Sequence, residues 1–176
     1  ELTETLREKQ KKGSLLWVLD KTKTAMGARR LRSDIEQPLI NIDDINARLD
    51  AVEQLCKNTV SRDEIREYLN PIYDMERLLG KVSYKSANPR DLLAFANSME
   101  MLPHIKTVLK EFDCKLLSEI EQEMDGLEDL YHLIKDAICE DPPVMIREGG
   151  MIRTGFDKDI DMSVSYTHLR AHETVL

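Results

Sequence analysis

The sequence lacks several features that would mark other classes of protein. No apolar run approaches the roughly 20 residues of a membrane-spanning helix, so we expect no membrane association. Aromatic residues make up 5% of the chain, which has seven glycines and six prolines among 176 residues. Together with 41% hydrophobic and 33% charged residues, this composition fits a soluble, helix-rich protein.

Cysteine and phosphate-binding motifs are also scarce. Cys56, Cys114 and Cys139 lie far apart and form no C-x-x-C pair, which indicates reduced thiols and a cytoplasmic setting. The glycines of "REGGMIRTG" lack the spacing of a nucleotide-binding loop. The first residues, "ELTETLREKQKK", include no initiator methionine and no signal-peptide pattern. We therefore expect an internal piece of a longer protein.

Charge is distributed unevenly along the chain, whose formal net charge is −8. Residues 1–32 carry nine Lys or Arg against four Asp or Glu, a net of +5. Residues 33–162 carry fifteen against twenty-eight, a net of −13. So acidic a region would repel phosphate groups, and DNA contact is expected, if anywhere, in the basic first part. An ordinary solvated helix face explains the same basic residues.

Helix signals are dense and strand signals are sparse. Asn88, Pro89 and Asp91 form a helix start, in which the asparagine caps, proline takes the first helical position and the acid lies in the first turn. Asn70 with Pro71 predicts a second such start. Further helices are predicted at the following segments: a short one capped by Ser14; one ending near Pro38; one capped by Asp43, with Ile45, Leu49 and Val52 on its apolar stripe; one capped by Ser61; and, after a break or kink at Pro103, Lys115–Met124 and Leu127–Cys139.

The helical residue pattern ends after residue 140. Two short apolar runs, "VMIR" and "MIRT", flank "EGG" in residues 144–154, which predicts a tight β-hairpin. The predicted fold class is therefore all-α: a multi-helix bundle that ends in a short hairpin.

No constellation of side chains predicts an active site. The many acidic residues lie beside Lys and Arg on predicted helix faces, as solvated surface residues do. His104 and His132 are isolated, without visible ligand partners. Trp17 lies in an apolar run and is predicted to belong to the core. We therefore expect no catalytic, cofactor-binding or metal-binding residue and no enzymatic activity in this chain.

Four long motifs occur in order: "GSLLWVLDKTKTAMGARRLR…EQPL", "INARLDAVEQL", "YDMERLLGKVSYKSANPRDLLAF" and "DPPVMIREGGMIRTGFDKDIDM". With them, residues 1–162 resemble the MutS family of DNA mismatch-repair proteins, in the helical core (lever) domain before the clamp insertion. The resemblance implies a parent protein that is a DNA-dependent ATPase. It would form a homodimer around double-stranded mismatched DNA, bind ATP and Mg, switch into a sliding clamp and meet a MutL-type partner.

Within that resemblance this segment is a lever between ATPase and clamp. Arg29, Arg30 and Arg32 then become candidate contacts to the DNA backbone or to neighbouring domains, although solvated or intradomain ion pairs explain them equally. A structural role is implied for the helix-start motif Asn88, Pro89, Arg90 and Asp91 and for the turn glycines Gly149 and Gly150. A different hypothesis is a helical interaction scaffold from a MutS-like paralogue without mismatch function.

The last residues, 163–176, read "SVSYTHLRAHETVL". His168, His172 and Glu173 have the spacing of a zinc-binding helix. However, Val164 to Thr174 also reproduce the translation of a common transposase-based sequencing adapter. We therefore predict a domain at 1–162 and a non-native tail at 163–176, produced by adapter read-through.

Overall fold

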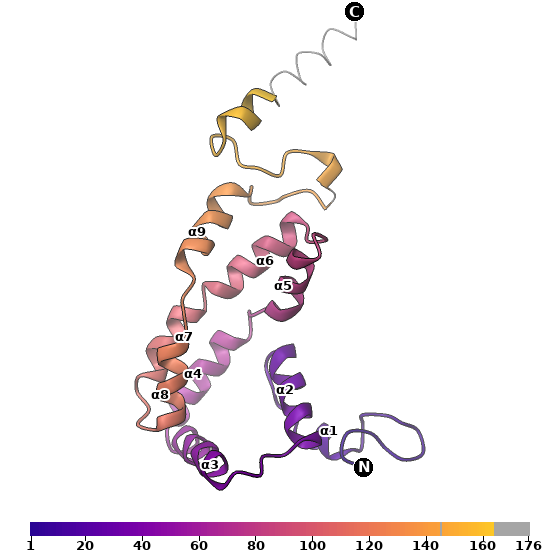
Figure 1. Ribbon diagram of the computed structural model, residues 1–176, viewed down its shortest axis with the longest axis vertical. Helices are drawn as coiled ribbons and strands as arrows, with labels where there is room; N and C mark the ends of the chain where they lie inside the picture. The colour runs from indigo at the N-terminus through magenta and orange to yellow at the C-terminus, as the bar shows by residue number, and fades with distance from the viewer. Residues whose placement is uncertain (145, 164–176) are drawn as a thin grey trace, which may run out of the picture.

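The computed structural model describes residues 1–144 and 146–163, and its regular structure there is helical (Figure 1). This confirms the all-α class. A last helical stretch begins at residue 158 and continues to the end of the described part. The elements are α1 (Leu15–Leu19), α2 (Ala25–Glu36), α3 (Ile42–Lys57), α4 (Thr59–Leu69), α5 (Met75–Ser83), α6 (Pro89–Met99), α7 (Leu102–Leu109), α8 (Lys115–Glu123), α9 (Glu128–Ala137) and the 3₁₀ helix η1 (Ile146–Glu148).

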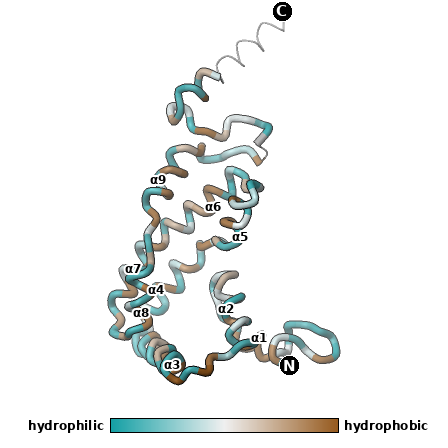
Figure 2. The backbone as a smooth tube through the Cα atoms, in the orientation of Figure 1, coloured by the Kyte–Doolittle hydropathy of each residue, from teal (hydrophilic) through white to brown (hydrophobic). Residues whose placement is uncertain are grey.

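The helices form a long, narrow body (Figure 1). At one end α3 packs against α8 and α4 against α7, and at the other α6 packs along α9 and against α5. Residues 150–163 extend beyond that second end, while α1 and α2 lie beside the first (Figure 1). Apolar and polar residues alternate along the helices, as expected for amphipathic packing, and an apolar stretch leads into α3 (Figure 2).

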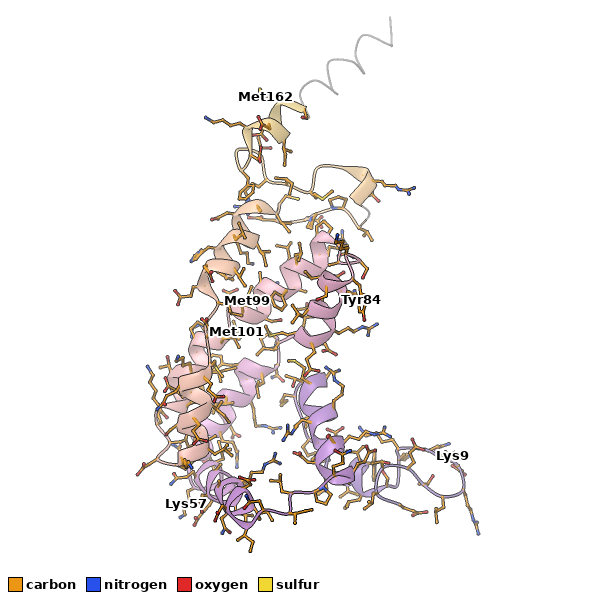
Figure 3. All side chains as sticks on the ribbon, in the orientation of Figure 1. Lys9, Lys57, Tyr84, Met99, Met101 and Met162 are labelled. Atoms are coloured by element: carbon orange, nitrogen blue, oxygen red, sulfur yellow. The ribbon has the colours of Figure 1, made fainter. Side chains whose placement is uncertain are left out.

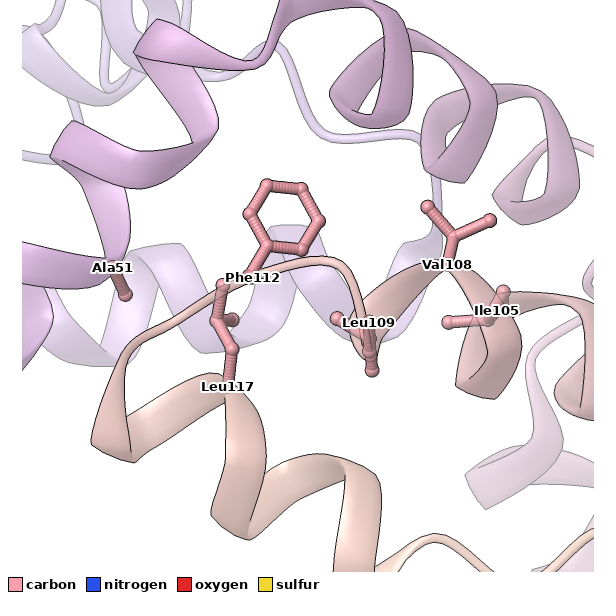
Figure 4. Packing of buried hydrophobic residues seen from close by; sticks show 6 residues of the cluster. All are labelled: Ala51, Ile105, Val108, Leu109, Phe112 and Leu117. Atoms are coloured by element: carbon pink, nitrogen blue, oxygen red, sulfur yellow. The ribbon is translucent and has the colours of Figure 1, made fainter.

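The main core lies where α3, α7 and α8 meet (Figure 4). Its buried members are Ala51, Ile105, Val108, Leu109, Phe112 and Leu117. Partly buried side chains from α3, α4 and α8 and from the loops beside them, such as Leu55, Tyr68 and Met124, pack around this cluster. The core therefore joins helices that are far apart in sequence into one packed unit.

Helices α6 and α7 follow one another almost without interruption along the body. Glu100 and Met101, which separate them, both keep right-handed helical backbone angles. Pro103 lies in the first turn of α7, where its missing N–H removes no helical hydrogen bond. The predicted break at Pro103 is thus confirmed as a joint between two helices, visible between Met99 and Met101 in Figure 3.

The helix start predicted at Asn70 and Pro71 is wrong. Asn70 ends α4, and α5 begins at Met75 with Asp74 as its cap. The Asp74 carboxylate accepts a hydrogen bond from the Arg77 N–H, so this later residue satisfies one of the free donors of the first turn. Between the helices the chain is held by the Tyr73 N–H, which donates to the buried hydroxyl of Ser98 at 3.0 Å.

Two predictions about apolar faces and two about capping are also corrected. Helix α3 is capped by Asn41 rather than Asp43, and α4 by Asn58 rather than Ser61. On α3 the core side chain is Ala51, whereas the predicted stripe is largely exposed, with Leu49 at 59% and Val52 at 55%. On α1, Leu16 is buried and Trp17 is 48% exposed.

The predicted hairpin at residues 144–154 is not confirmed. Residues 146–148 form η1, and the described strand-like pairing joins Ile138 to Ile152. The Cys139 N–H donates to Met151 O at 3.0 Å, and the Arg153 N–H donates to Ala137 O at 2.8 Å. The returning chain therefore pairs with the end of α9, while η1 occupies part of the first predicted strand.

Candidate functional site

Arg29 bridges two helices that are far apart in sequence. It lies on α2, and its Nη1 and Nη2 donate to the two carboxylate oxygens of Asp74 at 2.6 and 2.7 Å. Its Nε donates to Glu76 Oε2 at 3.1 Å. This forked geometry is the strong form of an arginine–carboxylate contact. One guanidinium thus joins α2 to the first turn of α5.

The bridge changes the acid–base behaviour of Asp74. Chiefly through the Arg29 hydrogen bond, the pKa of Asp74 is lowered from 3.8 to about 2. A carboxylate with a depressed pKa stabilises the fold above its unfolded pKa, and that contribution is lost as the pH falls through the folded value. The bridge should therefore hold above about pH 4 and fail towards pH 2.

Replacing Asp74 with asparagine should remove this acid-sensitive contribution. The amide oxygen can still cap α5, but it carries no charge to attract Arg29. We expect the wild-type chain to melt at a higher temperature than Asp74→Asn at pH 5, with the difference shrinking as the pH falls from 4 to 2. Thermal unfolding followed by circular dichroism measures it. A difference that stays constant over this range would contradict the assignment.

The other two arginines of α2 also face carboxylates of this chain. Arg30 pairs with Asp34 at 3.1 Å, and Arg48 of α3 contacts the same carboxylate at 2.8 Å. Burial alone would raise the pKa of Asp34, but the Arg48 hydrogen bond and charge lower it below 3.8. Arg32 pairs with Glu36 one turn away at 2.9 Å. All three guanidinium groups therefore have acidic partners within the described residues.

The helix-start motif forms a reciprocal cap at α6. Asn88 Oδ1 accepts from the Asp91 N–H at 2.8 Å, and Asp91 Oδ2 accepts from the Asn88 N–H at 3.0 Å. Lys81 of α5 donates to the same carboxylate at 2.7 Å. Burial acts to raise the pKa of Asp91, yet Lys81 and the cap hydrogen bond keep it below its usual value. The motif therefore anchors α5 to the first turn of α6.

Arg90 ties the same end of α6 to the chain beyond α9. Its Nε donates to Pro142 O at 2.9 Å, and its Nη2 lies 3.3 Å from Asp141 Oδ1. The segment then turns at Gly149 and Gly150, whose φ angles are +71° and +69°. A side chain at either position would be strained in this left-handed region.

The described residues show no cluster of side chains arranged for metal binding. Within residues 1–144 and 146–163, no group of three or more His, Cys, Asp or Glu could hold a metal ion. His104 stacks on Tyr68 and His132 meets Tyr131 edge-on, both with ring centres 5.2 Å apart. The spacing of His168, His172 and Glu173 lies outside the described part. No helix in that part is long and apolar enough to cross a membrane.

Comparison with known proteins shows which family this chain resembles. The family model described as MutS domain III matches residues 1–174. The "DNA mismatch repair protein MutS" of Lachnoclostridium phytofermentans is 65% identical over 161 residues, which is 92% of this chain and 17% of the relative. Those of Ruminiclostridium cellulolyticum and Clostridium tetani are 53% and 46% identical, each over 92% of this chain and 18% of the relative.

The chain therefore spans less than a fifth of the length of these curated relatives. These alignments cover 92% of this chain, and the all-helical fold is consistent with the matched domain III. The chain belongs to the MutS family of DNA mismatch repair proteins, of which it is a fragment in domain III.

Proposed function

We propose that this chain is the helical lever of a protein that binds mispaired DNA and couples ATP binding and hydrolysis to a sliding clamp. The observation that carries the proposal is the α6–α7 column, which runs along the narrow body (Figure 1). Its residues, 89–109, would span about 30 Å at the helical rise of 1.5 Å per residue. A column of that length can carry displacement between two distant sites.

The contacts of the column suit a mechanical role. Its first turn is anchored to α5 through Lys81 and to the chain beyond α9 through Arg90. Its far end lies in the main core, through Ile105, Val108 and Leu109. Packed interiors resist compression and repack between discrete arrangements. Movement at one end would therefore reach the other rather than dissipate.

The chemistry of the complete protein would lie elsewhere in the polypeptide. We propose that ATP and Mg bind another domain, that this segment has no active site of its own, and that the parent works as a cytoplasmic homodimer. Mismatched double-stranded DNA and a MutL-type protein would be its partners. For Arg29, Arg30 and Arg32, pairing with carboxylates of this chain favours intradomain ion pairs over contacts to the DNA backbone.

We also infer that the domain ends at residue 162 and that residues 163–176 are adapter read-through. Support comes from the translated adapter, which reproduces Val164 to Thr174. A family match that extends to residue 174 argues the other way. Reading the same locus from unfragmented genomic DNA decides between them: a native codon series in place of the adapter supports the boundary, and an unchanged tail refutes it.

Exchange of this segment into a relative tests the proposal. The matched 161-residue stretch of the Lachnoclostridium phytofermentans MutS, 65% identical, would be replaced by the corresponding residues of this chain. We expect the grafted protein to retain ATP turnover that mismatched DNA stimulates, within a few-fold of the parent. A scaffold from a paralogue without mismatch function would leave ATP turnover unresponsive to a mispair. The parent and a graft carrying a scrambled helix α6 are the controls.

A further inference from the structure

The first two helices form an arm beside the rest of the molecule. We define the arm as residues 14–36 and the body as α3 to α9. Inside the arm, Ser14 and Leu16 are buried. In contrast, no residue of α2 is buried, and the main core cluster contains no residue of the arm. The connecting residues 37–41 are exposed, and Ile40 is 92% exposed.

Charged contacts fasten this arm to the body at two places. Arg29 reaches Asp74 and Glu76 at the start of α5, 45 and 47 residues away. Asp34 reaches Arg48 on α3 at 2.8 Å. The Arg29 side chain is 49% exposed and that of Glu76 is 68% exposed, so dissolved ions have access to this contact.

Because these charges are exposed to solvent, the strength of their contact depends on the salt concentration. Attraction between exposed charges weakens as salt shortens the screening distance, from about 10 Å at 0.1 M to about 3 Å at 1 M. Burial of apolar surface is not weakened in this way. We propose that the contact of Arg29 with Asp74 and Glu76 is an ionic latch, which holds the arm against α5 at low ionic strength and releases it at high ionic strength.

Asp34 and Arg48 join the arm to α3, away from α5, whereas Arg32 and the Lys81–Asp91 pair do not join the arm to the body. Arg32 pairs with Glu36 and Glu4, both outside the body. Lys81 and Asp91 join α5 to α6 within the body, and the Asp91 side chain is 15% exposed. A latch at Arg29 therefore predicts that salt separates the arm from the body while α5 and α6 stay joined.

Zero-length cross-linking of the 176-residue chain tests the latch. In Arg29→Lys the new amine can form an amide with Asp74 or Glu76 after carbodiimide activation, and mass spectrometry then identifies the joined peptides. We expect the yield of this cross-link to fall about fivefold between 0.1 and 1 M NaCl. The Lys81–Asp91 cross-link in the same sample should change much less. Equal losses for both pairs, no cross-link at either salt concentration, or no dependence on salt would each overturn the proposal.

A second variant removes the charge instead of replacing it. Arg29→Gln should free the arm from α5 at low salt. The connection at Leu39 and Ile40, already exposed, should then bend more readily into the thermolysin active site, so that cleavage there is about fivefold faster than in the wild type. Arg32→Gln loses the same charge from the same helix and should be cleaved like the wild type. If thermolysin cleaves both variants at the same rate, the latch is refuted, whatever cross-link yield Arg29→Lys gives.

Discussion

Replacing Phe112 with alanine should lower the free energy of unfolding by about 3–5 kcal/mol, the usual cost of emptying a well-packed aromatic site. Phe112 is 4% exposed and belongs to the cluster that joins α3, α7 and α8 (Figure 4). Its removal leaves a cavity in the cluster where these helices meet. Urea denaturation of the 176-residue chain, followed by circular dichroism, measures the change.

The matched control for Phe112→Ala is Leu79→Ala. Leu79 is also apolar, but it is 57% exposed on α5, and alanine is at least as favourable as leucine inside a helix. We expect a change within about 0.5 kcal/mol for this surface position. Equal midpoints for the two variants would mean that Phe112 is not at the centre of the core.

Much of the helical fold could be predicted from local signals. At α6 the residues that start the helix are neighbours in sequence: Asn88 caps, Pro89 follows, and Asp91 completes the reciprocal hydrogen bonds. Pro103 marks the joint before α7 for the same reason, since its effect depends on its own ring. Such signals act between residues within one helical turn of each other, so they can be read directly from the sequence.

Predictions failed where distant residues decide the outcome. Helix α3 has two apolar sides, and its periodicity favours the side that carries Leu49 and Val52. The structure instead buries Ala51 against α7 and α8. A small side chain permits close approach of helices, and that advantage depends on partners more than 50 residues away. The predicted start of α5 was wrong for a similar reason: Asp74 both caps the helix and accepts hydrogen bonds from the distant Arg29.

The candidate site shows the same division. Arg29, Arg30 and Arg32 stand out as a basic run in the sequence, and ion pairing within the chain was one of the explanations for them. Their partners divide by distance: Asp34 and Glu36 lie one helical turn away and could have been read from i,i+4 spacing. Asp74 and Glu76 had no such signal, since 45 and 47 residues separate them from Arg29.

Softening the α6–α7 joint should uncouple the lever. Glu100 and Met101 continue the helical path between the two helices, so inserting Gly-Gly-Ser between them would let each helix move independently. Anchors at both ends of the column would remain. In the grafted MutS we expect mismatch binding without nucleotide to persist, while ATP-driven conversion to a sliding clamp slows by about tenfold, within the usual range of coupling between sites.

The same Gly-Gly-Ser placed between Lys11 and Lys12, which are exposed and lie outside the body, is the matched control. The deciding measurement is the rate at which ATP moves the grafted protein off a mispair and along DNA with blocked ends. A stiff lever predicts a slow rate for the insertion at residue 100 and an unchanged rate for the control. If both insertions leave the rate unchanged, this segment does not transmit movement between ATPase and clamp.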